Sequence, residues 1–457
     1  MRQTLVLDVV GLTPGLLPHA PCLAALAKRG AVRPLGTITP AVTCSVQSTL
    51  LTGLPPDQHG VVANGWYFRD LTQVSFWQQS DHLVSGEKVW EAARRRDPSF
   101  TCAKLFWWFN MYSSADFAVT PRPQYPADGR KLPDVYSEPT ELGRELQDTL
   151  GTFPLFQFWG PRAGIVASDW IAKASERVFS TRKPTLTLVY LPHLDYDLQR
   201  FGPEHPRAIA AVAAVDAVCG PLLDAADKAG AAVIVLSEYG ITEVTGAIHI
   251  NRTLREAGLL RVRDEQMGEQ LDAGASEAFA VADHQIAHVY VKRPERIAEV
   301  AALLRGLDGI ESVWSGSERQ AHGLEHPRSG EIVAMSRADR WFTYYHWLQD
   351  DRAPGYARTV DIHRKPGYDP VELFVDPTLR MPGLKLVWTL GKRKLGFRSL
   401  LDVIGLDAGL VRGSHGRPTD HADAGPVFIT SDPQHLPPGP DIAATDVKRA
   451  ILKHVFD

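Results

Sequence analysis

The 457-residue sequence has few cysteines, little net charge and no long apolar run. Its four cysteines are scattered without the close pairing of a metal-binding motif, which implies no disulfide and fits a reducing compartment. The net charge of -4 gives no electrostatic argument for a nucleic-acid or membrane partner. No apolar run approaches the roughly 20 residues of a membrane helix, and the N-terminal residues lack the features of a signal peptide, so we expect a cytoplasmic protein.

What the sequence does contain is an alternation of buried strands and helices. Residues 4–10, 185–191 and 231–236 form short apolar runs, and each of them ends in or just before acidic residues. Such continuous apolar runs are typical of buried parallel strands. Helical patterns stand between them, at residues 22–30, 87–96, 168–183, 207–230, 251–260, 295–307 and 446–456, and Ser168 is the expected N-cap of its helix. The pattern predicts an α/β fold with a mostly parallel sheet sandwiched by helices.

Residues 315–400 differ from the rest because they are rich in Trp, Tyr, Pro and Arg. We interpret them as a cap or insertion over the sheet edge, and we expect residues 1–314 and 401–457 to form the core. The aromatic run at 341–347 is more typical of core packing than of a substrate pocket.

Polar residues gather after the predicted strands, where open α/β sheets place their sites. Asp8, Asp195 and Glu238 follow three strands, and Thr43 and His415 lie in small-residue loops. Carboxylates with an imidazole suit Zn²⁺ or Mn²⁺. Two such ions roughly 3.5–4 Å apart could clamp a phosphoryl group. A threonine hydroxyl beside them could become a nucleophile, although a threonine before an apolar helical turn is more often an N-cap.

Several motifs resemble successive landmarks of the alkaline phosphatase superfamily. They are "VLDVVGL", "TCSVQSTLLTGLPPDQHGVVANGW", "YLPHLDYDLQRFGP", "LSEYG" and "GSHGRP…GPVFIT", which span residues from about 3 to 430 in the family's order. The nearest resemblance is to the type I phosphodiesterase/nucleotide pyrophosphatase branch, with phosphonoacetate hydrolase as a relative. The resemblance implies an alkaline-phosphatase-like fold, two divalent ions and a small phosphate or phosphonate ester as substrate.

The resemblance also implies individual roles. Thr43 stands at the position of the nucleophile, which attacks phosphorus to form a phosphothreonine that water hydrolyses. Asn64 resembles a polar residue near the substrate. The implied metal ligands are Asp8, Thr43, Asp195, Glu238 and His415.

Three positions depart from the family pattern. Gln199 and Tyr239 stand where the family has histidines, and Val46 replaces an asparagine that helps to hold the phosphoryl oxygen. Gln47, the next residue, could substitute for that asparagine. Replacement metal ligands are available at Asp283/His284 and at Asp361/His363, where the i, i+2 spacing puts two side chains on one face of an extended segment. We expect relocated ligands, with His284, Asp361 and His363 added to the metal site, although each histidine alone is more often hydrogen-bonded than metal-bound.

Three other functions compete with a metal-dependent phosphodiesterase. A sulfatase-like hydrolase needs Cys or Ser within C-x-P-x-R, but Cys44 is followed by Ser45 and Val46, so that motif is absent. A dinucleotide-dependent redox enzyme would need G-x-G-x-x-G after a strand, which is also missing. A catalytically decayed protein that binds phosphate esters stays open because of the departures at Val46, Gln199 and Tyr239. The sequence specifies neither the substrate nor the oligomeric state.

Overall fold

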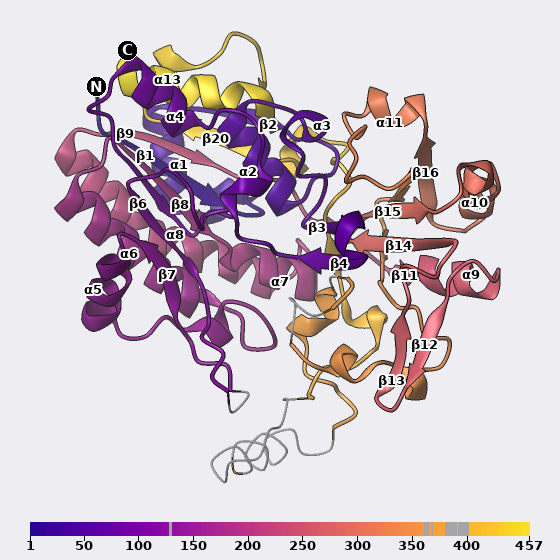
Figure 1. Ribbon diagram of the computed structural model, residues 1–457. Coiled ribbons are helices and arrows are strands. Elements are labelled where there is room, and N and C mark those ends of the chain that lie inside the picture. Colours follow the sequence, from indigo (N-terminus) through magenta and orange to yellow (C-terminus); the bar gives the residue numbers. More distant parts are fainter. Residues whose placement is uncertain (128–129, 361–364, 368, 380–390, 392–401) are drawn as a thin grey trace.

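The computed structural model describes residues 1–127, 130–360, 365–367, 369–379, 391 and 402–457. A large part with a central sheet and flanking helices lies beside a smaller part rich in short strands (Figure 1). Both chain ends lie on the large part, close to each other (Figure 1). The predicted positions Asp361 and His363 lie outside the described residues.

The large part is built on a nine-stranded sheet with the order β21-β2-β20-β9-β1-β8-β5-β6-β7. The central strands β9, β1, β8, β5 and β6 run parallel, and antiparallel pairs occur where β20 meets β9 and β2 and where β6 meets β7. The sheet is therefore mostly parallel, as the sequence predicts. Its strands are β1 (Thr4–Val9), β2 (Ala31–Gly36), β5 (Cys102–Leu105), β6 (Phe117–Pro121), β7 (Val135–Glu138), β8 (Leu186–Leu191), β9 (Ala232–Leu236), β20 (Val427–Thr430) and β21 (Ile442–Ala443).

The three central strands are buried along their whole length because helices cover both faces of the sheet. In the ladder, Asp8 of β1 lies between Tyr190 of β8 and Leu236 of β9. This register brings the carboxyl ends of β1, β8 and β9 to one edge. The acidic residues at and after the ends of these strands therefore lie near that edge of the sheet.

Helices flank this sheet, and most of the predicted helices are present. They are α1 (Pro21–Arg29), α2 (Thr43–Thr52), α4 (Val89–Arg96), α5 (Thr140–Leu150), α6 (Ile165–Arg182), α7 (His193–Phe201), α8 (Pro206–Ala229) and α13 (Val447–Phe456). The expected N-cap at Ser168 is wrong. Helix α6 begins one turn earlier, at Ile165 after Gly164, and Ser168 is buried within it. Asp195 lies in the first turn of α7 rather than at the end of a strand.

Helix α8 is long and apolar enough to cross a membrane by length and composition alone. It packs against α1, α6 and α7 and over the central sheet. Its buried Asp216 accepts hydrogen bonds from the backbone N–H groups of Cys22 and Leu23 at the start of α1. This helix is part of the packed core, so its composition is weak evidence for a membrane span.

The smaller part contains a separate antiparallel sheet with the order β14-β15-β17-β16. Its strands are β14 (Ala278–Asp283), β15 (Ile286–Val291), β16 (Ile310–Ser315) and β17 (Ile332–Ser336). The boundary predicted at residue 315 therefore falls between two paired strands. Helices α9 (Ile250–Glu256), α10 (Ile297–Arg305) and α11 (Ser317–Ala321) lie around this sheet (Figure 1).

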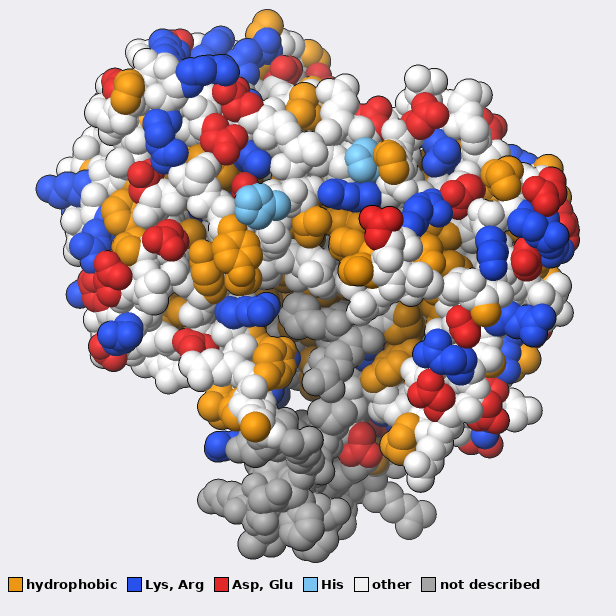
Figure 2. All heavy atoms as spheres, in the orientation of Figure 1, with side chains coloured by type: hydrophobic (Ala, Val, Ile, Leu, Met, Phe, Trp, Pro, Cys, Tyr) orange, Lys and Arg blue, Asp and Glu red, His pale blue; other side chains and the backbone are white. Residues whose placement is uncertain are grey.

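The aromatic run at 341–347 packs as a second hydrophobic core. Trp341, Tyr344 and Trp347 are almost completely buried and pack with Ile404 and Val411. On the surface, hydrophobic side chains gather near the junction of the two parts (Figure 2).

Candidate active site

The site is built around Thr43, the first residue of α2. The residue before this helix, Val42, has extended backbone angles, and the helix ends at Gly53, whose φ of 72° lies in the left-handed region that favours glycine. No side chain caps the helix at Val42. Thr43 is buried, with 3% of its surface exposed, and lies where the helix dipole and free backbone N–H groups favour negative charge.

Asp8 and Glu238 form a buried acidic pair that one carboxamide bridges. The Gln47 Nε2 group donates to Asp8 Oδ2 at 3.2 Å and to Glu238 Oε1 at 2.7 Å. The Gln47 Oε1 atom accepts the backbone N–H of Trp108 at 2.8 Å. These three hydrogen bonds use both the Nε2 group and the Oε1 atom of Gln47, so this side chain holds the two carboxylates in place. No polar atom of this side chain is left for a phosphoryl oxygen.

The pKa of Asp8 lies well above its usual value, first because the side chain is buried and second because Glu238 is negatively charged nearby. Burial also raises the pKa of Glu238, while Asp8, Gln47 and the hydroxyl of Thr43 act in the opposite direction. Two carboxylates this close cannot both ionise without a positive partner. The pair is therefore a place where either a proton or a cation is needed.

A second chain of hydrogen bonds runs from Thr43 to Asp195. The Thr43 Oγ1 atom is 3.0 Å from the Tyr239 hydroxyl, which donates to Asp195 Oδ1 at 3.4 Å. One turn further along α7, Gln199 Nε2 donates to Asp195 Oδ2 at 2.6 Å. Burial and the charge of Glu238 raise the pKa of Asp195 to about 7, so this carboxyl can take up a proton near neutral pH.

His415 completes this wall of the site. Its Nδ1 lies 2.9 Å from the carbonyl oxygen of Ala41, and burial lowers its pKa to about 3, so the ring is neutral and Nδ1 donates. Its Nε2 is 3.9 Å from Asp195 Oδ1. The Tyr239 ring stacks on the imidazole with centroids 3.7 Å apart and planes 4° apart. On another side the His284 ring lies 3.8 Å away, held by a backbone φ of 58° that non-glycine residues rarely adopt.

Asn64 and Asp283 form a neighbouring pair that supports α2. Asn64 Oδ1 accepts the backbone N–H of Cys44 at 2.9 Å. Asp283 accepts from the Asn64 backbone N–H at 2.8 Å and from Asn64 Nδ2 at 3.1 Å. Asn64 thus holds the first turn of the helix beside Thr43, and Asp283 holds Asn64. Asp283 and His284, the candidate replacement ligands, therefore have different partners. Asp283 accepts hydrogen bonds from Asn64, whereas the His284 ring contacts His415.

A small cavity of about 40 Å³ opens beside the Thr43 hydroxyl. By volume it has room for about three water molecules. Besides the residues already described, its walls are aromatic, and they comprise Trp77, Trp108, Phe158, Trp159, Tyr190 and Tyr196.

Two residues from the distant segment after residue 364 hold one of these walls. Trp159 Nε1 donates to Glu372 Oε2 at 3.0 Å, and Glu372 Oε1 accepts from Lys365 Nζ at 2.7 Å. The side chains of Lys365 and Glu372 are completely buried. Sequence reasoning missed this pair, since Lys365 reads as a solvated residue and nothing marks Glu372.

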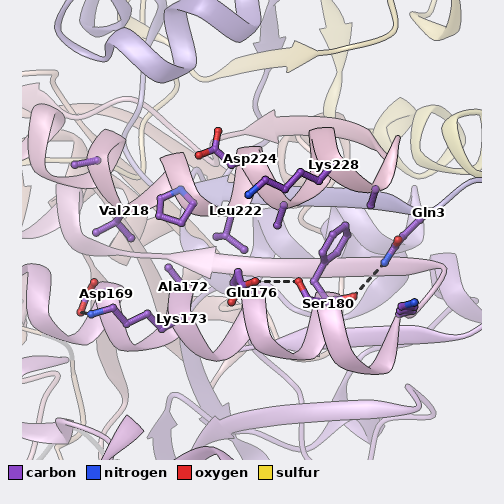
Figure 3. Close-up of a pocket in the computed structure, with 16 residues that line it drawn as sticks. Gln3, Asp169, Ala172, Lys173, Glu176, Ser180, Val218, Leu222, Asp224 and Lys228 are labelled. Carbon is purple, nitrogen blue, oxygen red and sulfur yellow. Dashed lines mark hydrogen bonds and ion pairs between the residues drawn. The ribbon is translucent and has the colours of Figure 1, made fainter. Parts of the chain in front are cut away.

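A larger hollow lies elsewhere, on the outer face between α6 and α8. It has a volume of about 800 Å³, and Val218 and Leu222 of α8 face Lys173 and Glu176 of α6 across it (Figure 3). None of its lining residues lines the cavity beside Thr43.

The residues fit one cation better than two. Asp8 Oδ1 and Glu238 Oε2 are buried without a hydrogen-bond partner, and with the Thr43 hydroxyl they offer an all-oxygen set for one hard cation. At the other implied metal position, Asp195 is hydrogen-bonded to Gln199 and Tyr239, the two residues that stand where the family has histidines. Within the described part of the chain, no group of three His, Cys, Asp or Glu side chains is arranged to hold a metal ion.

The comparisons with known proteins agree on the family. The family model for type I phosphodiesterase/nucleotide pyrophosphatase matches residues 4–369. An uncharacterized pyrophosphatase/phosphodiesterase of Schizosaccharomyces pombe is 26% identical over 243 residues, which cover 50% of this chain and 41% of that protein. The chain thus spans about two fifths of the length of this curated relative.

Solved structures with the same fold have low sequence identity. Phosphonoacetate hydrolase from Sinorhizobium meliloti 1021, in complex with phosphonoformate, is 15% identical with a TM-score of 0.63, over 99% of this chain and 96% of that chain. Inactive murine ectonucleotide pyrophosphatase/phosphodiesterase 5, in complex with AMP, is 14% identical with a TM-score of 0.57, over 100% and 95% of the two chains. These likenesses confirm the predicted fold class. The chain belongs to the type I phosphodiesterase/nucleotide pyrophosphatase family.

Proposed function

We propose that the chain hydrolyses small phosphate or phosphonate esters, with Thr43 as the nucleophile. The observation that carries this proposal is the position of the Thr43 hydroxyl. It lies at the N-terminus of α2, in the wall of a cavity, within hydrogen-bond distance of Tyr239 and next to the acidic pair of Asp8 and Glu238. Family membership supports ester hydrolysis, and the AMP and phosphonate complexes of the structural neighbours support a small-molecule substrate.

The hydrogen-bond chain gives the Thr43 proton a destination. Thr43 Oγ1 forms a bond to phosphorus while the bond from phosphorus to the leaving oxygen breaks. The Thr43 proton passes to the Tyr239 hydroxyl as the Tyr239 proton passes to Asp195 Oδ1. Solvent supplies the proton of the leaving group. In the second half of the reaction, water attacks phosphorus and the bond from phosphorus to the Thr43 oxygen breaks. The Thr43 oxygen recovers its proton from Asp195 by the reverse route, and the attacking water releases a proton to solvent.

The family is generally metal-dependent, and Asp8, Glu238 and Thr43 would hold a divalent cation in this chain. Such a cation would lower the pKa of the Thr43 hydroxyl and offset negative charge on the phosphoryl group. The sequence suggested two ions, most readily zinc. An all-oxygen donor set favours Mn²⁺ or Mg²⁺ instead, since zinc prefers nitrogen and sulfur ligands.

A decayed site that binds phosphate esters without hydrolysing them is the second candidate. The exchange of two family histidines for Gln199 and Tyr239 favours it. So does the Gln47 bridge, which satisfies one oxygen each of Asp8 and Glu238 without any cation.

Turnover of bis-p-nitrophenyl phosphate separates the two candidates. The wild-type protein should hydrolyse it with added Mn²⁺, and Thr43→Ala should lose about a thousandfold or more of kcat, since removal of a nucleophile costs this much or more in other hydrolases. Thr43→Ser, which keeps a hydroxyl, is the matched control and should retain much of the activity. If the wild type shows no turnover with Mn²⁺, Mg²⁺ or Zn²⁺ but binds the ester, the second candidate is correct.

A cytoplasmic location is also a proposal, which rests on the sequence features described above. Fractionation of cells that express the native gene tests it, and recovery outside the cytoplasmic fraction would contradict it.

A further inference from the structure

The position that the family resemblance assigns to a second cation is filled by hydrogen bonds in this chain. Gln199 Nε2 occupies one oxygen of Asp195 at 2.6 Å, and the Tyr239 hydroxyl faces the other at 3.4 Å. Tyr239 also stacks flat on His415. The exchanges at Gln199 and Tyr239 together compensate for an absent cation, because an amide and a phenol donate the hydrogen bonds that the Asp195 carboxylate then needs.

The remaining two donors are also too far apart for one tetrahedral ion. His415 Nε2 and Asp195 Oδ1 are separated by 3.9 Å. Ligands of a tetrahedral zinc, with bonds of about 2.0–2.2 Å, lie about 3.4 Å apart. Tyr239 adds no third ligand there, because its ring lies flat on His415 and its hydroxyl is hydrogen-bonded to Thr43 and Asp195.

The acidic pair of Asp8 and Glu238 differs from the Asp195 position, because it still has oxygens available for a cation. Asp8 and Glu238 keep one unpartnered buried oxygen each, and the Thr43 hydroxyl lies close enough to Glu238 to stabilise its charge. An unpaired buried carboxylate oxygen is costly, so a cation there would be strongly favoured.

We propose that this chain binds a single divalent cation at Asp8 and Glu238, and that Gln199 and Tyr239 replace the second cation beside Asp195. The inference rests on the proposed function only in placing a cation at the acidic pair. It gives Tyr239 the roles of orienting Thr43 and passing on its proton, in a place where the relatives' pattern has a metal-binding histidine.

Metal stoichiometry tests this directly. The full chain is stripped with a chelator, reloaded with Mn²⁺ or with Zn²⁺, passed through a desalting column and analysed for bound metal per chain by mass spectrometry. We expect one ion in the wild type and none in Asp8→Asn/Glu238→Gln. We expect two ions in Gln199→His/Tyr239→His, which restores both imidazoles, and one ion in the matched control Gln199→Asn/Tyr239→Phe.

Two ions in the wild type, or none, would overturn the inference. If a wild type with two ions loses one in His363→Ala, the second site has been relocated to that segment instead. Should the double histidine variant fail to fold by circular dichroism, the wild-type stoichiometry still decides. Turnover of bis-p-nitrophenyl phosphate by the same samples distinguishes failure of the single-cation inference from failure of the proposed hydrolysis. Two ions with Thr43-dependent turnover overturn only the single-cation inference, whereas one ion without turnover supports it and removes the proposed hydrolysis.

Discussion

Replacing Glu372 by Gln should destabilise the protein strongly although this residue lies far from Thr43 in the sequence. Lys365 Nζ and Glu372 Oε1 are 2.7 Å apart and neither side chain has any solvent exposure. At an effective dielectric constant of about 20, opposite charges at this distance attract by roughly 6 kcal/mol. The variant removes this attraction and leaves the buried Lys365 ammonium with only the carboxyl of Asp369 as a nearby acidic group. Loss of one partner of such a pair typically costs about 3–5 kcal/mol.

The assay is equilibrium unfolding in urea, followed by tryptophan fluorescence, for Glu372→Gln, for Lys365→Met and for the double variant Lys365→Met/Glu372→Gln. The glutamine keeps an acceptor for Trp159, so the single variant isolates the charge. We expect the double variant to be more stable than Glu372→Gln, because it leaves no buried ammonium. A loss below about 1 kcal/mol in the single variant, or a double variant as unstable as the sum of the two single ones, would refute the reasoning.

Three further predictions concern protons and cations. Burial lowers the pKa of His288 to about 4, so between pH 6.5 and pH 4 the unfolded chain binds a proton at this residue that the native state does not bind. The free energy of unfolding should therefore be about 2 kcal/mol lower at pH 5 than at pH 7. This difference should shrink in His288→Asn. An identical pH dependence of urea unfolding in both proteins would contradict it. Mn²⁺ at a hundredfold excess over its Kd should stabilise the wild type by about 2.7 kcal/mol, and thermal unfolding of Asp8→Asn/Glu238→Gln should not respond. Tyr239→Phe should lower kcat about a hundredfold or more with little change in KM, because it breaks the proton path from Thr43 to Asp195, and an unchanged kcat would argue against that role.

The fold could be predicted from the sequence because its signals are local. The runs at 4–10, 185–191 and 231–236 are apolar throughout, as strands buried on both faces must be, and they form the centre of the sheet. The order of the motifs then supplied the family. The smaller sheet was harder, because only β14 and β15 form a tight hairpin, while β17 pairs with β15 and β16 across longer connections and no local pattern marks where a separate sheet begins.

The site could be predicted only in part. Asp8 lies near the end of β1, and Asp195 and Glu238 come after β8 and β9, so their convergence follows from the parallel topology. The tasks of Gln47 and Tyr239 depend on rotamers and on side-chain distances, which no spacing encodes. The sequence marked Tyr239 as a departure from the family pattern and Gln47 as a candidate substitute for the asparagine replaced by Val46, but only the structure shows the bonds that they make. Glu372 gave no signal at all, because its partner Lys365 and the indole of Trp159 meet it only in the folded chain.

The most direct test of the central claim is to trap the intermediate on Thr43. Acid quench during turnover of bis-p-nitrophenyl phosphate, followed by digestion and peptide mass spectrometry, should find a phosphoryl ester on the peptide that contains Thr43, and Thr43→Ala should give none. Turnover that persists in Thr43→Ala, or a wild type that turns over without any modification of Thr43, would contradict the account.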